Sequence, residues 1–277
     1  MDPFVTEHDF ALLARERCVF SVLDSILRGP CAIVRSDHKS LILCHSTPPY
    51  PVWIWTRDAL TEAEREAAWR LTEACCPLSA GYRLMMKYEL ADCFLERSRE
   101  DGLRVGISRQ LFAYDCPLPR KPERGADGGP YLCLPEDAAE AALLLSRFYA
   151  EIGEHCPPEA AVLEKTRQKI DGHALFFWKD AAGKTVACSG WRHNQGLATI
   201  TDVYTLPEAR RRHYAQNLVY ALTGQARDAG FLPTLYTNAN YAASNACYQK
   251  IGYVLRGKLC TLSLLEGPEA EREAAGR

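Results

Sequence analysis

The sequence predicts an α/β protein with a mixed sheet and two domains. The chain of 277 residues is roughly twice the length of a common domain of about 100–150 residues. Apolar strand-like runs alternate with amphipathic helical patterns in both halves. A segment rich in proline, glycine and charge, PLPRKPERGADGGP at 117–130, separates the halves and is predicted to be an interdomain linker. The expected domains are therefore 1–116 and 131–265.

The first half is predicted to begin with a helix over 9–28. Strands are expected at 31–35, 40–44 and 51–56, the last of which reads PVWIWT. A helix begins after Thr61, because in the motif TEAE the Thr61 hydroxyl and Glu64 have the spacing of a capping box. A strand at 83–87, a helix at 88–99 and a strand at 103–114 complete this half.

The second half is expected to place a strand at 131–134 before helices at 136–152 and 158–170. Strands follow at 173–179, 185–192 and 197–205. A helix over 213–229 is indicated by apolar residues that fall on one helical face, namely Ala215, Leu218, Val219, Leu222 and Ala226. A strand at 234–238, a short helix at 244–251 and a strand pair at 253–265 close the domain, and 266–277 form a frayed charged tail. Both halves share one order of elements, which favours a duplicated fold.

Composition excludes several classes of protein. Hydrophobic residues make up 47% of the chain and charged residues 25%, so a disordered or fibrous protein is excluded. The net charge of -2 provides no general attraction to nucleic acid or to a membrane. The first residues lack the pattern of a signal peptide and no apolar run has the length of a membrane span, so we expect a cytoplasmic location. The 12 cysteines include no CxxC pair, so we expect free thiols and no metal.

The most informative segment is TDVYTLPEARRRHYAQNLVYAL at 201–222. A strand ends at Thr205, a turn carries Arg210, Arg211 and Arg212, and the amphipathic helix begins directly afterwards. Unpaired backbone N–H groups and the helix dipole then meet at one point, which favours a phosphate group, and guanidinium groups strengthen this preference. The alternative is that the arginines form a solvated surface cluster.

A second segment, TNANYAASNACYQKIGY at 237–253, contains a short helix that Ser244 or Asn245 caps and Gly252 ends. Together the two segments resemble the acetyl-CoA-binding core of the GNAT family of N-acetyltransferases, over roughly 131–265. The family's phosphate loop matches Arg210, Arg211, Arg212, His213, Tyr214 and Ala215. Its later motif matches Asn245, Tyr248, Gly252 and Tyr253.

The resemblance implies a GNAT-like acyl-CoA N-acyltransferase fold and a set of roles. Main-chain groups of Val203, Tyr204 and Thr205 would pair with the pantetheine arm of acetyl-CoA. The N–H groups of 211–215 would hold its diphosphate, and Asn240 and Asn245 would contact the cofactor. The Tyr248 hydroxyl would protonate the departing thiolate, and a backbone N–H near Val203 would stabilise the oxyanion. Asp202 is the candidate general base, with Glu208 or a chain of water molecules as alternatives.

Two positions depart from the family pattern. His213 and Arg211 stand where many members have glycine, so their side chains must tilt away or weaken diphosphate binding, although their charge compensates. In the first half, the strand with Trp53 and Trp55 is followed by RDALTEAE, which has no glycine and is acidic. This half is expected to be a degenerate GNAT-like domain that does not bind the cofactor.

The expected activity is direct transfer of acetyl from acetyl-CoA to a primary amine. The sequence does not distinguish a small molecule from a peptide as the acceptor, and it holds no pattern that sets the oligomeric state. A non-catalytic acyl-CoA-binding or regulatory module is the alternative, favoured by His213 in the loop. A nucleic-acid-binding role for the arginines is disfavoured, because the charge is balanced and no basic stripe is interleaved with aromatic residues.

Overall fold

A computed structural model describes residues 1–153 and 157–265. The chain forms two compact units that alternate along the sequence. The first consists of Met1–Ala113, Asn238–Asn240 and residues 256–265, and the second of Tyr114–Thr237 and Tyr241–Leu255. The predicted tail at 266–277 lies outside the described residues.

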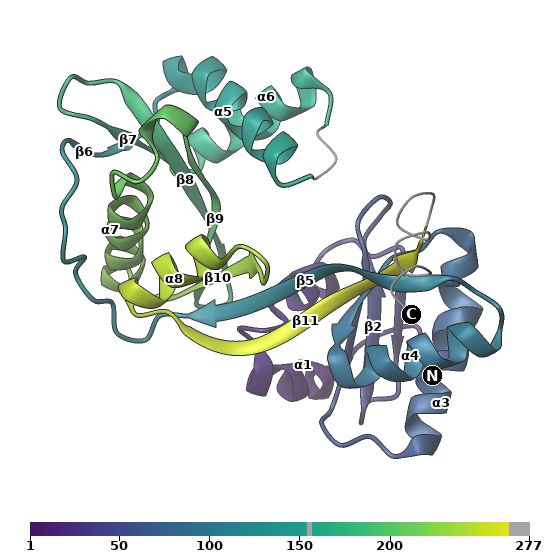
Figure 1. The fold of residues 1–277 in the computed structure, drawn as a ribbon. Helices are drawn as coiled ribbons and strands as arrows, with labels where there is room; N and C mark the ends of the chain where they lie inside the picture. The colour runs from purple at the N-terminus through teal and green to yellow at the C-terminus, as the bar shows by residue number, and fades with distance from the viewer. Residues whose placement is uncertain (154–156, 266–277) are drawn as a thin grey trace. The chain divides into compact units, whose positions relative to one another are not determined.

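The first unit contains four α-helices and a sheet (Figure 1). Its helices are α1 (Glu7–Leu13), α2 (Ser21–Leu27), α3 (Glu62–Cys75) and α4 (Tyr88–Glu100). Its strands are β1 (Ile33–Ser36), β2 (Leu41–His45), β3 (Val52–Thr56), β4 (Leu84–Lys87) and most of β5 (Val105–Asp115) and β11 (Val254–Leu264). The predicted helix over 9–28 is wrong, because the chain turns between α1 and α2. This turn buries Val19 and Phe20 in the unit's interior.

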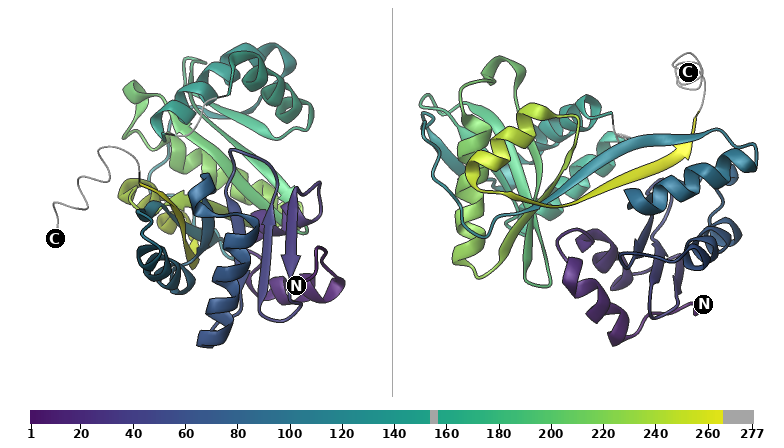
Figure 2. Two further views of the ribbon diagram at one scale, coloured as in Figure 1. Left: turned by 90° about the vertical axis from the view of Figure 1, so that its right-hand side faces the viewer. Right: turned by 60° about the horizontal axis from the view of Figure 1, so that its bottom comes forward.

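The second unit has a sheet in the order β10-β9-β8-β7-β6. The strands are β6 (Gly129–Leu132), β7 (Leu175–Lys179), β8 (Thr185–Asn194), β9 (Leu197–Thr205) and β10 (Leu232–Asn238). The helices are α5 (Ala138–Glu151), α6 (Glu159–Asp171), α7 (Tyr214–Asp228) and α8 (Ala242–Ile251). Helices α5 and α6 lie side by side on one face of this sheet and α7 covers the other, as Figures 1 and 2 show. These bounds confirm the helices and strands predicted between 131 and 251.

The two units repeat one pattern of strand pairing. In the first unit β1 to β3 pair antiparallel and β3 pairs parallel with β4. In the second unit β7 to β9 pair antiparallel and β9 pairs parallel with β10. A helix connects each parallel pair, α3 in one unit and α7 in the other, and a shorter helix follows each. The repeated element order in the sequence is therefore accompanied by repeated pairing.

The last strand differs from its prediction. The sequence predicts a strand pair at 253–265 within the second domain, whereas β11 is one strand that pairs antiparallel with β4 of the first unit. Cys260 and Leu262 of β11 are buried in the core of that unit with Leu84 and Met86. Alternating apolar residues predict a strand but do not specify its partner, because many strands present a compatible face.

Residues 117–128 have no helix or strand, as predicted, and they lie along the second unit. The Arg120 N–H donates to the carbonyl of Ile251 at 2.6 Å. The Trp178 Nε1–H donates to the carbonyl of Asp127 at 2.7 Å. The segment is therefore fastened to the second unit, in addition to connecting the halves of the sequence.

Candidate functional site

The parallel strands β9 and β10 separate part-way along their length. Their pairing runs from Leu197 opposite Leu232 to Ile200 opposite Leu235 and then stops. Both strands continue beyond this point, to Thr205 and Asn238. Asp202 has a left-handed φ of 56°, and the register with β8 shifts opposite this stretch. A bulge of this kind bends a strand, so β9 turns away from β10 and leaves an unpaired edge.

The unpaired edge of β9 carries main-chain groups that point away from β8. The Leu206 N–H donates to Val186 at 3.0 Å, on the β8 side. Because successive residues of a strand alternate in direction, the N–H groups of Val203 and Thr205 point to the opposite side. Tyr204 is paired with Cys188 of β8. The main-chain groups of Val203 and Thr205 therefore face away from β8, and those of Tyr204 face β8.

The turn before α7 has the backbone shape of a glycine-containing loop without any glycine. Arg211 and His213 have φ values of 63° and 65°, in the left-handed region that glycine favours. Among the residues that the structure describes, no partner is recorded for the backbone N–H groups of 211–216. A helix N-terminus with unpaired N–H groups and left-handed residues forms an anion-binding concavity. This backbone is compatible with the prediction that the side chains of Arg211 and His213 tilt away from the diphosphate.

The three arginines of the turn differ in what they contact. Arg210 forms an ion pair with Glu151 and donates from Nε to the carbonyl of Thr205 at 3.1 Å. Arg212 lies 3.7 Å from Asp127 and 5.0 Å from the centre of the Tyr214 ring. Arg211 is exposed, and no ion pair is recorded for it within the described residues. The guanidinium group most available to an incoming anion is therefore that of Arg211.

Tyr214 and Ala215 begin α7. The buried Tyr214 side chain donates its hydroxyl hydrogen to Asp127 at 2.6 Å, and this hydrogen bond lowers the pKa of the Asp127 carboxyl. The side chain of Tyr214 therefore anchors the segment 117–128, and Tyr214 can reach an anion only through its N–H. Ala215 is half-buried and presents only its N–H in the first turn of the helix.

Asn245 is committed to contacts within the protein. Its Oδ1 accepts from the Tyr114 hydroxyl at 3.0 Å, and its Nδ2 donates to the carbonyl of Tyr241 at 3.0 Å. The sequence predicts a cofactor contact for this amide, but both of its ends have protein partners. Asn240 lies exposed in the turn before α8, where its N–H donates to Asn238 Oδ1 at 2.9 Å.

Tyr248 lies on α8 with 8% of its surface exposed. Its ring meets the Tyr253 ring edge-on at 6.0 Å between centroids. Within the described part of the chain no hydrogen bond is recorded for its hydroxyl, whereas the Tyr253 hydroxyl is bonded to Thr223 at 2.8 Å. Burial raises the pKa of Tyr248 well above its ordinary value. The Tyr248 side chain is therefore largely enclosed by the protein. Its hydroxyl keeps its proton at neutral pH, and no acceptor for that proton is recorded within the described residues.

Comparison with known proteins identifies the central part of the chain. Residues 140–253 match the family model described as "Acetyltransferase (GNAT) family". This segment is a GNAT domain. It contains β9, the turn with the three arginines, α7, β10 and α8, so the family match spans the features described above.

Solved structures share the GNAT fold over most of the chain. A GCN5-related N-acetyltransferase from Kribbella flavida is 17% identical, with a TM-score of 0.62 over 92% of this chain and 97% of its own. A second from Sphaerobacter thermophilus is 12% identical, with a TM-score of 0.59 over 86% and 84%. A GNAT-family acetyltransferase from Colwellia psychrerythraea is 14% identical, with a TM-score of 0.54 over 82% and 81%. No curated protein shows significant sequence similarity to the chain.

The candidate base, Asp202, is engaged on the α6 side of the GNAT domain. Its carboxylate forms an ion pair with Lys169 and accepts from the Thr201 hydroxyl at 2.8 Å. Only 9% of its side chain is exposed. Glu208 is exposed in the turn before α7, 3.9 Å from Lys184. The sequence did not predict the role of Lys169, because it lies 33 positions from Asp202.

Helix α3 of the first unit holds the place that α7 holds in the second unit, between two parallel strands. Its N-terminus is capped by Thr61 and Glu64. The Thr61 N–H donates to Glu64 at 2.7 Å, and the Glu64 N–H donates to the Thr61 hydroxyl at 3.3 Å. A hydrogen bond from Arg57 is the main cause that lowers the pKa of Glu64 to about 2. A carboxylate at this helix start repels an anion, which supports the prediction that the first unit does not bind the cofactor.

Across residues 1–153 and 157–265, no three His, Cys, Asp or Glu side chains gather in a way that would hold a metal ion. No helix in the same part of the chain is both long enough and apolar enough to cross a membrane.

If the turn holds the diphosphate of acetyl-CoA, as the family resemblance implies, replacing His213 with glycine should tighten that binding several-fold. Glycine adopts the φ of this position without the cost of a Cβ, which is about 1 kcal/mol, and it lets a diphosphate approach the backbone more closely. Calorimetric titration measures the change. His213→Ala is the matched control, because it removes the imidazole and keeps the Cβ. Equal affinities for the two variants would show that the Cβ does not obstruct the site.

Proposed function

We propose that the protein is an N-acetyltransferase that moves the acetyl group of acetyl-CoA directly to a primary amine of a small molecule or peptide. Membership of the GNAT family supports acyl transfer as the general chemistry. One observation supports the more specific proposal. Backbone N–H groups at the start of α7 that have no recorded acceptor among the described residues lie, with Arg211 beside them, at the end of the unpaired edge of β9.

Each element of this site has a distinct task in the transfer. The N–H groups of 211–216 and the Arg211 guanidinium hold the diphosphate. The Val203 and Thr205 edge pairs with the pantetheine arm as an added strand would. The Val203 N–H then lies near the thioester carbonyl, where it stabilises the negative charge that develops as the amine attacks. Tyr248 supplies the proton that the departing thiolate requires.

The proton that the amine loses passes to water, and water returns a proton to the Tyr248 phenolate before the next turnover. Asp202 is held by Lys169 and Thr201, so we assign it the task of fixing the bulge in β9. This assignment replaces the sequence prediction of Asp202 as general base by one of its alternatives, a chain of water molecules. An amine that reaches the site already neutral needs no dedicated base.

We propose that the first half of the chain is a degenerate GNAT-like domain and that the second half carries the transferase site. The repeated strand pairing supports the relationship, and the acidic, self-capped start of α3 supports the loss of cofactor binding. A cytoplasmic location remains a proposal from the sequence. It is supported by the described cysteines, all of which are free thiols.

Calorimetric titration with acetyl-CoA tests this function, and we expect one binding site per chain. Arg211→Glu should weaken acetyl-CoA at least tenfold and leave pantetheine, which has no diphosphate, unchanged. The control is Arg227→Glu, which makes the same charge change in the last turn of α7 and should have little effect on either ligand. Equal weakening of acetyl-CoA and pantetheine by Arg211→Glu would contradict the diphosphate assignment.

A non-catalytic acyl-CoA-binding module is the second candidate. It is favoured by the engagement of Asp202 with Lys169, which leaves the predicted base in an ion pair. This candidate predicts tight acetyl-CoA binding without thiol release against a broad panel of primary amines. Thiol release above the hydrolysis rate with any amine of the panel would exclude it.

A further inference from the structure

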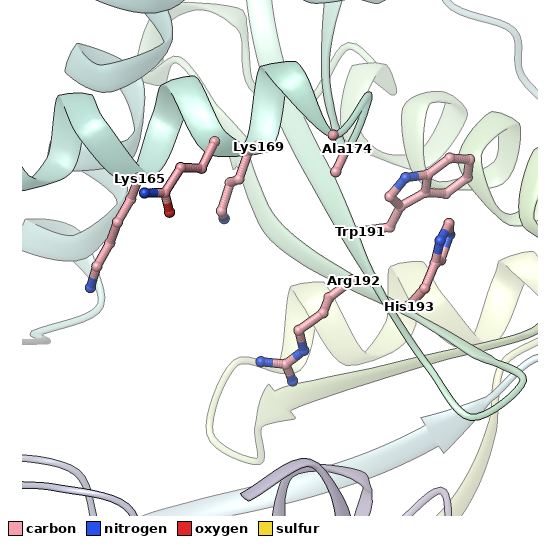
Figure 3. Close-up of a pocket in the computed structure, with 8 residues that line it drawn as sticks. Lys165, Lys169, Ala174, Trp191, Arg192 and His193 are labelled. Carbon is pink, nitrogen blue, oxygen red and sulfur yellow. The ribbon is translucent and has the colours of Figure 1, made fainter. Parts of the chain in front are cut away.

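A basic hollow lies on the α6 side of the second unit, beside Asp202 but outside the diphosphate site. It has a volume of about 380 Å³ and lies between α6, the turn that follows it, and β8. Its lining residues are Lys165, Gln168, Lys169, Gly172, Ala174, Trp191, Arg192 and His193 (Figure 3). These positions form no recognisable sequence motif, because the lysines and the arginine are separated along the chain.

The charge of the hollow is strongly positive. Lys165 and Lys169 are one helical turn apart on α6, and Figure 3 shows both side chains and Arg192 extending toward the same open region. Lys169 is neutralised by Asp202. For Lys165 and Arg192, no ion pair is recorded among the described residues. Two uncompensated cations therefore face one small volume.

The acidic groups nearest to the hollow do not compensate these cations. Glu164, on the same helix, accepts from Gln168 Nε2 at 3.1 Å and does not line the hollow. Asp171, at the end of α6, is exposed and does not line the hollow either. Asp202 also lies outside the lining, and its ion pair with Lys169 engages it already. Like-charged side chains placed together around a cavity repel one another, so an anionic ligand would stabilise the arrangement.

One wall of the hollow is aromatic. Trp191 is half-buried and packs edge-on against Phe176, with 5.2 Å between centroids. His193 lies 5.2 Å from Trp191 and stacks on Phe231 at 4.3 Å. The rings are fixed by these contacts, and they give an apolar surface beside the cations. Such a combination suits a small organic anion better than a bare inorganic ion.

The hollow is connected to the proposed transfer point through two contacts. The first is the ion pair of Lys169 with Asp202, which directly precedes Val203. The second is the close packing at Gly190, where an added Cβ would lie 2.7 Å from the carbonyl of Ala174 and 3.6 Å from Asp202 Oδ2. The hollow thus borders Lys169, whose ion-pair partner Asp202 belongs to the bulge of β9.

We infer that this hollow binds the acceptor of the transfer reaction, and that the acceptor is a small amine that carries a carboxylate or a phosphate group. The inference rests on the proposed acetyltransferase function and specifies its substrate class. Lys165 and Arg192 hold the anionic group, Trp191 packs against the apolar part of the molecule, and the amine extends toward the bulge of β9. These residues determine specificity and take no part in the chemical step.

Matched pairs of acceptors that differ only in charge test the inference. Phenylalanine and phenylalaninamide form the carboxylate arm, and phosphoethanolamine and ethanolamine form the phosphate arm. For at least one arm, kcat/KM for the anionic member should exceed that for the neutral member at least tenfold. In Lys165→Gln and Arg192→Gln this preference should fall to threefold or less, mainly through KM, and the Kd of acetyl-CoA should not change. Arg167→Gln on α6 is the control, since Arg167 is exposed and does not line the hollow.

Binding of N-acetylphenylalanine and N-acetylphenylalaninamide provides a readout that does not depend on turnover. If the protein binds acetyl-CoA but acetylates no amine, or binds no acetyl-CoA at all, the proposed function fails, and this measurement still decides whether the hollow holds the anionic group of a small organic molecule. Tighter binding of the charged compound, lost in Lys165→Gln and Arg192→Gln, supports an anion site. In an active wild-type enzyme, equal rates within both acceptor pairs would overturn the inference. A preference for the charged acceptor that both variants retain would also overturn it. Where there is no turnover, equal binding of the two acetylated compounds would overturn the anion site.

Discussion

Replacing Tyr248 with phenylalanine is expected to lower kcat about 100-fold, because a general acid contributes about 10²–10⁴ to a rate. The Kd of acetyl-CoA should stay within twofold of the wild-type value. The Tyr248 hydroxyl has no recorded partner within the described residues, so its removal breaks no hydrogen bond to that part of the protein. The thiolate would then have to leave without a positioned proton. Thiol release and calorimetry measure the two quantities.

The neighbouring Tyr253 supplies a matched control. Tyr253→Phe removes the same atom from a ring 6.0 Å away, but this hydroxyl is bonded to Thr223. The variant should lose about 1 kcal/mol of unfolding free energy and keep its kcat. If Tyr248→Phe weakens acetyl-CoA binding and retains kcat, the Tyr248 hydroxyl acts in binding.

The pH dependence of the rate provides a further check on the proton donor. Tyr248 donates only when protonated, and burial raises its pKa above the ordinary value. The protonated fraction therefore stays close to one as pH rises toward the ordinary tyrosine pKa of about 10. The rate should show no alkaline decline that disappears in Tyr248→Phe. A decline near pH 8 or 9 that the variant lacks would contradict the assignment.

Local sequence patterns predict the elements of the second unit because each is determined over a few residues. The apolar stripe of α7 and the glycine that ends α8 appear where they were expected. The arginine turn also keeps its predicted place at the start of α7. The left-handed backbone of Arg211 and His213 was not predicted, since non-glycine residues seldom adopt it.

Contacts between distant positions account for what the sequence did not predict. The partner of β11, the ion pair of Asp202 with Lys169, and the hydrogen bond of Asn245 with Tyr114 all depend on tertiary packing. The family resemblance predicted a cofactor contact for Asn245 from a motif of residues that are neighbours in the sequence. The hydrogen bond arises from β5, which lies more than a hundred residues earlier.

Replacing Gly252 with alanine is expected to lower the free energy of unfolding by about 3 kcal/mol, from backbone strain and a forced displacement together. Gly252 ends α8 with a φ of 106°. A Cβ at this position would lie 2.4 Å from the carbonyl oxygen of Leu118. The clash is with backbone, and the Arg120 N–H bond to Ile251 holds that backbone in place. Denaturant unfolding monitored by circular dichroism measures the loss.

Gly230→Ala separates the two contributions. Gly230 follows α7 with a φ of 84°, and an added Cβ there meets no atom within 4 Å. This variant therefore carries only the left-handed strain, about 1 kcal/mol. The excess loss in Gly252→Ala reports the close approach of residues 117–128 to α8. Equal losses would mean that the segment moves aside freely, and that α8 keeps Tyr248 in place without support from it.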